Sequence, residues 1–461
     1  MAPTAPILDA QCPCVAVFIR PPQTWKAPVV KIAYLAAGAA GMVCGSCLHD
    51  NTLAAELLRL GEDVVLVPIY TPLRSDEQNV SLPRVFFGGI NVYLQQNWSL
   101  FRHTPRWFDN LLDHPALLGK LATRAHTVDP QQLGELTVSM LRGEHGNQSK
   151  ELDKLVDWLI AEIQPEVVHL SNSMMVGLAR KIAKRCGPPV ICSLSGEDIF
   201  LEKLTEPYYS QTRTLLRERA KDVHAFVALN NYYADFMAAY LAVERNRIHV
   251  IPHGLQLEGH GVRSDQSLNQ PCRIGFLARV CHDKGLHLLV QACELLCDRS
   301  DIPHFELHAA GYLGAGDRGY FQSLTDEIAR GPLANRFKYL GEISRSEKIA
   351  FLQELDIFST PTIYHESKGL PALEALANGV PVVLPRHGCF PELIAQTRGG
   401  LLYKPESAPD LAAKLAELLL NPGQARELGE RGQQSIRANF HATAMANKTL
   451  DLYRCLLGGG K

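Results

Sequence analysis

The sequence predicts an α/β fold in which two Rossmann-like, doubly wound domains face each other across a cleft. The chain has 461 residues, which is more than one compact core usually holds. Short apolar runs alternate with amphipathic helical stretches along most of its length, as in parallel sheets covered by helices. A polar stretch after Pro252-His253-Gly254 reaches Pro271 and divides this alternation into two series, as an interdomain linker does.

These observations divide the chain into four parts. Residues 1–28 contain six prolines and no apolar core behind a basic start, so we expect a flexible leader rather than a signal peptide. Residues 29–255 form the first domain and 272–439 the second, while 440–461 form a terminal helix. The first domain carries an insertion at about 70–150, where the regular alternation stops.

In the first domain, Val29 to Ala36 is predicted to be a strand, followed by a turn from Gly38 to Gly45 and a helix from Asp50 to Leu60. Gly61 ends this helix as a left-handed cap. Later strands are expected at 63–69, 166–170, 190–194, 225–229 and 248–251, and helices at 174–185, 207–222 and 232–241.

The insertion holds the aromatic residues Trp98, Phe101, Trp107 and Phe108 among prolines, histidines and arginines. Sugar rings stack on aromatic faces, so this segment suits the wall of a sugar-acceptor site. It equally suits ordinary packing beneath a loop. The sequence leaves both interpretations open.

The second domain is predicted to have strands at 273–278, 304–310, 336–340, 356–360, 380–384 and 400–403, with helices between them and helical segments from Ala408 to Leu457. In doubly wound sheets, ligands bind beyond the carboxyl ends of the strands. Motifs that follow a predicted strand are therefore the candidates for a functional site.

The strongest motif is the string from His365 to Glu374, which follows a predicted strand and opens a helix at Pro371. The loop from Ser367 to Leu370 brings backbone N–H groups to the helix N-terminus, a site for an anion such as phosphate. Glu366 precedes the helix and Glu374 lies about one turn inside it. Carboxylates accept hydrogen bonds from hydroxyls, so the string could hold phosphate, ribose and hexose together.

Two cations follow the first strand of the same domain. Arg279 and Lys284 lie in a loop between the strand that ends at Ala278 and a helix that opens at Gly285. Fixed cations there would stabilise the charge of a departing nucleotide diphosphate. The sequence contains no Asp-x-Asp pair, the usual metal ligand of metal-dependent transferases, so we expect no metal and no cofactor.

Gly314-Ala315-Gly316-Asp317-Arg318-Gly319 matches the dinucleotide fingerprint Gly-x-Gly-x-x-Gly and makes a dehydrogenase a rival interpretation. The motif follows the second strand of its domain rather than the first, which favours a glycine loop near the donor. Binding of a nicotinamide cofactor would distinguish the two.

The formal net charge of −2 indicates neither nucleic acid nor an anionic membrane as a partner, and no apolar run is long enough to span a membrane. We expect a cytoplasmic protein. The 12 cysteines are scattered. Cys44 and Cys47 resemble a redox pair at a turn, but packing of small residues explains them as well.

The spaced glutamates, the Arg279/Lys284 loop and the Pro-x-Gly linker together resemble family 4 of the retaining glycosyltransferases, from about Lys31 onward and most strongly in residues 272–403. Residues 337–341 and 352–361 are similar to the family's nucleotide-facing strand and to the segment before its glutamate motif. The resemblance implies a GT-B fold whose first domain binds the acceptor and whose second binds the donor. It also implies that the last helix crosses back to the first domain.

By position, the resemblance assigns catalytic roles to Arg279, Lys284 and Glu366: the two cations bind the diphosphate and the glutamate contacts the donor sugar. Glu374 would contact the ribose, and the amides of Gly369 and Leu370 would touch phosphate or sugar. The remaining donor-side residues it implies are Ser367, Lys368, Leu340 and, in the turn from Gly38 to Gly45, Gly41.

The chain departs from the family pattern in its first domain and linker. Ser195 stands where the family usually has a histidine, and we take Ser195, Glu197 and Asp198 as acceptor-side candidates. His253 and Gln256 replace the usual asparagine and aspartate of the linker motif.

The resemblance implies a hexosyltransferase that retains the anomeric configuration by same-face attack, with the departing phosphate as base. Its partners would be a nucleotide sugar and an acceptor, which is a sugar, a polyol or a lipid-linked glycan. A nucleotide-sugar epimerase and a non-catalytic nucleotide-sugar-binding protein remain alternatives.

Overall fold

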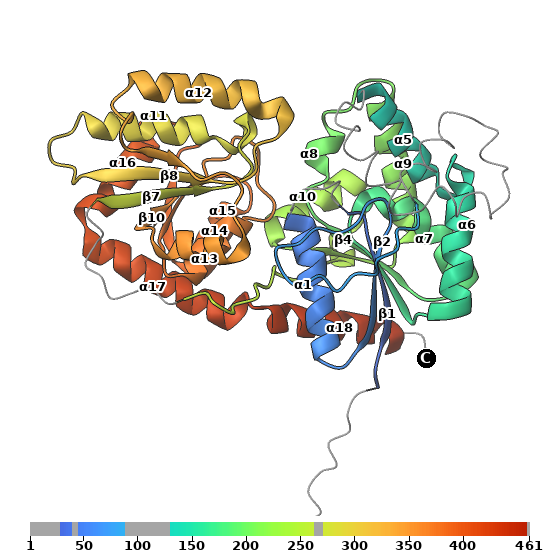
Figure 1. The fold of residues 1–461 in the computed structure, drawn as a ribbon. Helices are drawn as coiled ribbons and strands as arrows, with labels where there is room; N and C mark the ends of the chain where they lie inside the picture. Colours follow the sequence, from blue (N-terminus) through green and yellow to red (C-terminus); the bar gives the residue numbers. More distant parts are fainter. Residues whose placement is uncertain (1–27, 39–44, 88–129, 262–270, 459–461) are drawn as a thin grey trace, which may run out of the picture.

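The computed structural model describes residues 28–38, 45–87, 130–261 and 271–458. These residues form two domains, each built on a six-stranded parallel sheet with helices around it (Figure 1). The strand order is β2-β1-β3-β4-β5-β6 in the first sheet and β12-β11-β10-β7-β8-β9 in the second. The predicted α/β fold with two doubly wound domains is confirmed.

The strands of the first sheet are short and largely buried. Their bounds are β1 (Lys31–Ala36), β2 (Asp63–Pro68), β3 (Val167–Leu170), β4 (Val190–Leu194), β5 (Ala225–Ala228) and β6 (Ile248–Val250). The helices of this domain are α1 (Gly45–Arg59), α5 (Pro130–Arg142), α6 (Ser149–Trp158), α7 (Ala179–Cys186), α8 (Asp198–Leu201), α9 (Tyr208–Arg219) and α10 (Asn231–Leu241).

The second sheet consists of β7 (Cys272–Leu277), β8 (Phe305–Ala310), β9 (Phe337–Tyr339), β10 (Ile357–Phe358), β11 (Val382–Pro385) and β12 (Gly400–Tyr403). Its domain carries the helices α11 (Leu286–Cys297), α12 (Arg318–Arg330), α13 (Arg345–Gln353), α14 (Leu370–Ala377), α15 (Phe390–Thr397), α16 (Ala408–Leu420) and α17 (Pro422–Asn439). The last helix is α18 (Ala442–Gly458).

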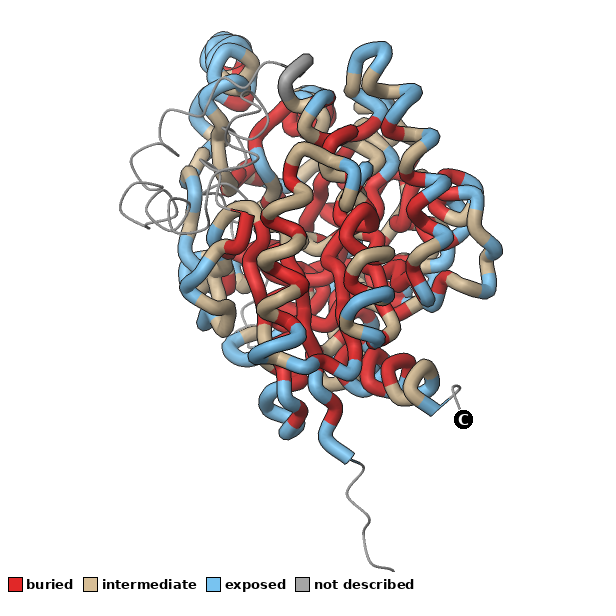
Figure 2. The backbone as a smooth tube through the Cα atoms, turned by 90° about the vertical axis from the view of Figure 1, so that its right-hand side faces the viewer, coloured by how far each residue is buried: buried red, intermediate tan, exposed pale blue. Residues whose placement is uncertain are grey.

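Each sheet is packed on both faces, which explains why its strands are apolar without alternation. Along β1, Ala33 and Leu35 belong to one hydrophobic core, while Ile32 and Tyr34 belong to another on the opposite face. Successive side chains of a strand point to opposite faces, so one strand serves both cores. The buried backbone lies at the centre of the molecule and the exposed turns lie outside (Figure 2).

The helix after β1 begins earlier than the sequence predicted. α1 starts at Gly45, whereas the apolar pattern indicated a start at Asp50. The five residues added at this end begin with Gly45 and Ser46 and contain only two apolar side chains, so they do not continue a hydrophobic repeat. Gly61 has φ +92°, as expected for the residue that ends this helix.

The predicted insertion at 70–150 contains α5 and the start of α6. Residues 88–129, which include Trp98, Phe101, Trp107 and Phe108, lie outside the described residues. The proposed acceptor wall is therefore a prediction that the described chain does not test.

The C-terminal helix packs on the first domain. α17 and α18 run along one side of both domains (Figure 1), and Met445, Ala446 and Leu450 share a hydrophobic core with Val30 and Ile32. The Tyr453 hydroxyl lies 2.5 Å from Nδ1 of the buried His169 on β3. These contacts hold α18 against the first sheet.

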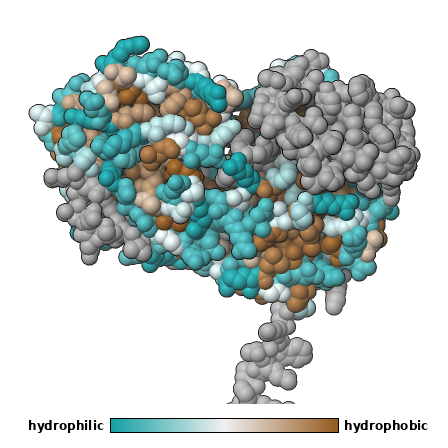
Figure 3. Space-filling view, in the orientation of Figure 1, coloured by the Kyte–Doolittle hydropathy of each residue, from teal (hydrophilic) through white to brown (hydrophobic). Residues whose placement is uncertain are grey.

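Hydrophilic side chains cover much of the face seen in Figure 3, and apolar surface gathers over α1. Leu58 on this helix exposes 41% of its surface. Within the described ranges, none of the helices has the length and apolar character needed to cross a membrane.

Candidate active site between the domains

The strand order of the second sheet reverses beside β7. The chain leaves β7 toward β8, whereas β10 lies on the opposite side of β7. Such a reversal of strand order leaves space beyond the carboxyl ends of the two strands. The loop after β7 carries Arg279 and Lys284, and the loop after β10 carries Glu366.

A glycine brings these two loops together. Gly285 has φ +76° and caps α11, and a Cβ atom there would lie 1.9 Å from the carbonyl oxygen of Pro361. The N–H of Ile363 also donates to the carbonyl of Asp283 at 3.0 Å. Only glycine permits this approach, which places Lys284 against the loop after β10.

Lys284 forms an ion pair with the first motif glutamate. Its Nζ lies 2.8 Å from Oε2 of Glu366, and the Tyr364 hydroxyl donates to the same oxygen at 2.6 Å. Burial would raise the pKa of Glu366, but the neighbouring Lys284 ammonium and these hydrogen bonds lower it to about 2. Glu366 is therefore a carboxylate at neutral pH.

The start of α14 supplies backbone donors beside this pair. The N–H groups of Ser367 and Lys368 donate to Oε1 of Glu366 at 3.1 and 3.2 Å, so these two amides already have an acceptor. Gly369, at φ +67°, precedes the helix, and Pro371 lies in its first turn as predicted. The N–H groups of Gly369 and Leu370 have no acceptor in the part of the chain that the structure describes, and they leave an anion site at the helix N-terminus.

Arg279 is exposed and approaches the glycine-rich loop. Its Nε lies 3.6 Å from Oδ2 of Asp317, within the fingerprint sequence 314–319. That loop follows β8, one strand away from the reversal of strand order. The glycine motif thus borders the predicted phosphate site instead of forming the first turn of its domain.

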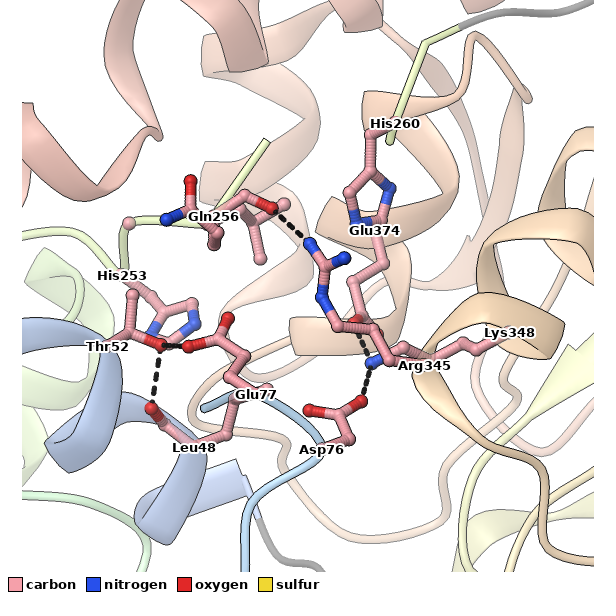
Figure 4. Close-up of a pocket in the computed structure, with 12 residues that line it drawn as sticks. Leu48, Thr52, Asp76, Glu77, His253, Gln256, His260, Arg345, Lys348 and Glu374 are labelled. Carbon is pink, nitrogen blue, oxygen red and sulfur yellow. Dashed lines mark hydrogen bonds and ion pairs between the residues drawn. The ribbon is translucent and has the colours of Figure 1, made fainter. Parts of the chain in front are cut away.

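The second motif glutamate has a partner that the sequence did not suggest. Oε1 of the buried Glu374 lies 2.5 Å from Nζ of Lys348 on α13, which lies 2.6 Å from Oδ2 of Asp76 in the first domain. These residues line a small interdomain cavity (Figure 4). Thr52, Glu77, His253, Gln256, His260 and Arg345 also line it.

The acceptor-side candidates surround the turn after β4. Glu197 is buried and accepts from the N–H groups of Ser173 and Ser195 at 2.8 and 2.6 Å, so it orders its own loop. Asp198 accepts from the Tyr233 hydroxyl at 2.6 Å, and burial raises its pKa. A Cβ atom on Gly196 would lie 2.7 Å from Oγ of Ser367, so this turn meets the glutamate motif across the domain boundary.

Lys368 also crosses the boundary. Its Nζ donates to Oγ of Ser46, in the first turn of α1, at 2.7 Å. Leu340 follows β9 and is 47% exposed. Gly41 lies outside the described residues, as does most of the turn from Gly38 to Gly45.

A histidine pair joins the linker to α1. Nδ1 of His253 lies 2.8 Å from Nδ1 of His49, so one ring donates and the other accepts. Burial lowers the pKa of His49 to about 4 and that of His253 well below its ordinary value, so both rings are neutral at neutral pH. The linker histidine noted in the sequence thus has a structural partner.

No group of three or more His, Cys, Asp or Glu side chains in the described ranges is arranged to hold a metal ion. The charged groups of the site include Lys284, Lys348 and Arg279, together with Glu366 and Glu374. The roles inferred for these residues stay predictions. The structure does show that Lys284, Glu366 and the start of α14 lie together.

Comparison with known proteins identifies two matching sequence models. Residues 263–435 match the glycosyl transferases group 1, and residues 135–258 match Glycosyltransferase Family 4. Together they cover nearly all of the second domain and, in the first domain, the part from residue 135 onward.

Curated relatives are similar over part of their length. The chain is 30% identical over 224 residues to amylovoran biosynthesis glycosyltransferase AmsK of Erwinia amylovora, covering 46% of this chain and 53% of the relative. It is 31% identical over 186 residues to D-inositol 3-phosphate glycosyltransferase of Corynebacterium urealyticum, covering 40% and 43%. The chain thus spans about half the length of these relatives.

Solved structures share the fold. Sucrose-phosphate synthase of Thermosynechococcus elongatus superimposes with a TM-score of 0.68 at 18% identity, covering 93% of this chain and 100% of that one. Anabaena HepE in complex with UDP gives 0.65 at 15% identity, covering 92% and 99%. The predicted GT-B architecture is confirmed by these similarities.

Proposed function

The chain belongs to the family 4 glycosyltransferases of GT-B fold, and we propose that it transfers a hexose from a nucleotide-diphosphate sugar to an acceptor hydroxyl with retention of configuration and without a metal ion. The observation that carries this proposal is the Lys284–Glu366 pair, which lies at the N-terminus of α14 where β7 and β10 end.

The geometry suits a departing diphosphate. Lys284 and Arg279 follow β7, and the N–H groups of Gly369 and Leu370 begin α14. Negative charge that develops on the diphosphate as the sugar bond breaks would be stabilised by these fixed donors and cations. They would perform the neutralisation for which other transferases use a metal ion.

Glu366 would hold the sugar rather than transfer a proton. With a pKa of about 2 it stays ionised at neutral pH, so it cannot serve as a general acid there. An ionised carboxylate accepts hydrogen bonds from sugar hydroxyls. In same-face attack, the departing phosphate oxygen takes the proton of the acceptor hydroxyl, so no protein nucleophile is required.

A screen of candidate ligands would identify the nucleotide and the acceptor. UDP is the first nucleotide to test, because HepE has been solved with UDP. Thermal shift should be measured with UDP, GDP and ADP sugars, since a ligand that binds the folded state raises its melting temperature. The stabilising donor is then incubated with a sugar, a polyol or a lipid-linked glycan. NMR follows the release of the nucleoside diphosphate and shows the anomeric configuration of the product.

Ser195 favours one second candidate, a nucleotide-sugar-binding protein without catalysis. It stands where the family usually has a histidine near the reacting sugar, and its N–H is used by Glu197. Donor binding with no turnover on any acceptor would support this candidate. Acceptor-dependent release of the nucleoside diphosphate would exclude it, and conversion of the donor sugar without an acceptor would indicate an epimerase.

A further inference from the structure

Lys348 joins two carboxylates that belong to different domains. Its Nζ lies 2.5 Å from Oε1 of Glu374 on α14 and 2.6 Å from Oδ2 of Asp76, which follows β2. The side-chain exposures are 12% for Lys348, 6% for Glu374 and 13% for Asp76. All three line the interdomain cavity, with Lys348 pointing toward the other two (Figure 4).

The electrostatics of this cluster hold Lys348 in its charged form. Burial acts against an ammonium, but Glu374 and Asp76 outweigh it and raise the pKa of Lys348. Burial raises the pKa of Glu374, and Lys348 opposes this shift. Two carboxylates share one ammonium, so Glu374 depends on Lys348 to remain a carboxylate in a buried place.

We propose that Lys348 is a positioning residue that holds the Glu374 carboxylate for the ribose hydroxyls of the donor, and that Asp76 completes this positioning when the two domains meet. The inference rests on the proposed function, which puts the ribose at Glu374. Lys348 contacts Oε1, so Oε2 is the oxygen that accepts from a hydroxyl.

The two domains contribute unequally to this arrangement. Lys348 and Glu374 both belong to the donor domain, on α13 and α14, so their pair forms within one domain. Asp76 belongs to the first domain and reaches Lys348 only across the boundary. Contact between the domains therefore adds Asp76 as a second partner of the ammonium that holds Glu374.

The test measures recognition of ribose separately from overall affinity. Calorimetric Kd values are measured for UDP and for 2′,3′-dideoxy-UDP, or for the matching pair of whichever base the thermal screen identifies. Hydrogen bonds to a charged carboxylate make the wild type prefer the ribonucleotide by about tenfold or more. In Lys348→Met this preference falls to within about twofold, and Asp76→Asn gives an intermediate value. A side chain with a merely structural role would weaken both ligands equally and leave the ratio unchanged.

A double variant distinguishes loss of positioning from loss of folding. Lys348→Met leaves two unpaired carboxylates, whereas Asp76→Asn/Lys348→Met keeps the net charge of the cluster and should lose the ribose preference as well. Lys203→Met is the matched control, because Lys203 pairs with Asp283 across the same boundary at 2.7 Å without touching Glu374. It should retain the wild-type ratio.

Three results would each contradict a separate part of the argument for Lys348, Asp76 or nucleotide binding. If the double variant keeps the ribose preference while Glu374→Ala loses it, Lys348 does not position the glutamate. If Asp76→Asn has the wild-type ratio, the contribution of the first domain is refuted. If wild-type protein binds no nucleoside diphosphate at all, the proposed function fails first, and the two failures are thereby distinguished.

Discussion

The Nζ of Lys284 lies 2.8 Å from Oε2 of Glu366, although 82 residues separate them in the chain. This pair joins the loops that follow β7 and β10, the two strands between which the order of the second sheet reverses. A cation that would meet the diphosphate is thereby fixed next to a carboxylate that would meet the sugar.

Lys284→Met should reduce kcat/KM for the donor by about two orders of magnitude, because one fixed donor to the developing charge is lost. The free energy of unfolding should also fall by about 3 kcal/mol, because Glu366 is left as a buried carboxylate without its cation. Steady-state kinetics and urea denaturation check the two effects. Lys414→Met, which breaks a surface pair with Glu417 on α16, should change neither measurably. An activity within threefold of wild type would remove Lys284 from the mechanism.

Acid should abolish the stabilisation that Glu366 contributes. Its pKa is lowered from 4.5 to about 2 in the folded protein, so between these pH values the unfolded chain binds more protons. The contribution, about 3 kcal/mol, is complete above about pH 5 and is lost as pH falls toward 2. Urea denaturation of wild type and Glu366→Gln across this range should give free energies of unfolding that differ by a constant amount above pH 5. The two values should converge below pH 4. If the difference in free energy of unfolding between the two proteins stays constant down to pH 3, the Glu366 carboxylate is not held ionised.

At a donor concentration near the wild-type Kd, Glu374→Ala should abolish the rise in melting temperature that the donor produces in wild-type protein. The carboxylate is the group expected to accept from the ribose, and without it the affinity falls by about tenfold or more. Glu430→Ala, on the exposed side of α17, should leave the rise unchanged. A full thermal shift in Glu374→Ala would show that the nucleotide binds elsewhere.

Gly285→Ala should destabilise the protein and lower activity together. A Cβ atom at this position would lie 1.9 Å from the carbonyl oxygen of Pro361, and φ +76° is strained for alanine. We expect a loss of about 2 kcal/mol or more, measured by urea denaturation, and a displaced Lys284. Gly423→Ala is the matched control, since a Cβ atom there meets nothing within 4 Å on helix α17. Equal stability of the two variants would contradict the close approach of the loops.

Much of the fold could be predicted from periodicity. The strands at Val190–Leu194 and Gly400–Tyr403 have the predicted bounds, because each is a short buried run between turn residues. α1 begins five residues before Asp50, where the hydrophobic pattern indicates its start, because Gly45, Ser46 and His49 add no apolar side chain to that pattern. Local patterns indicate burial only where buried residues are apolar.

The sequence by itself determined the two doubly wound domains, the helix N-terminus at Pro371 and the loops that carry Arg279, Lys284 and Glu366, because each depends on residues close together in the chain. Only the tertiary structure decided that Glu374 pairs with Lys348 and that Lys348 reaches Asp76, 272 residues away. No local pattern encodes that contact. The distance between two such side chains depends on how the separate domains pack, and this is a property of the whole folded chain.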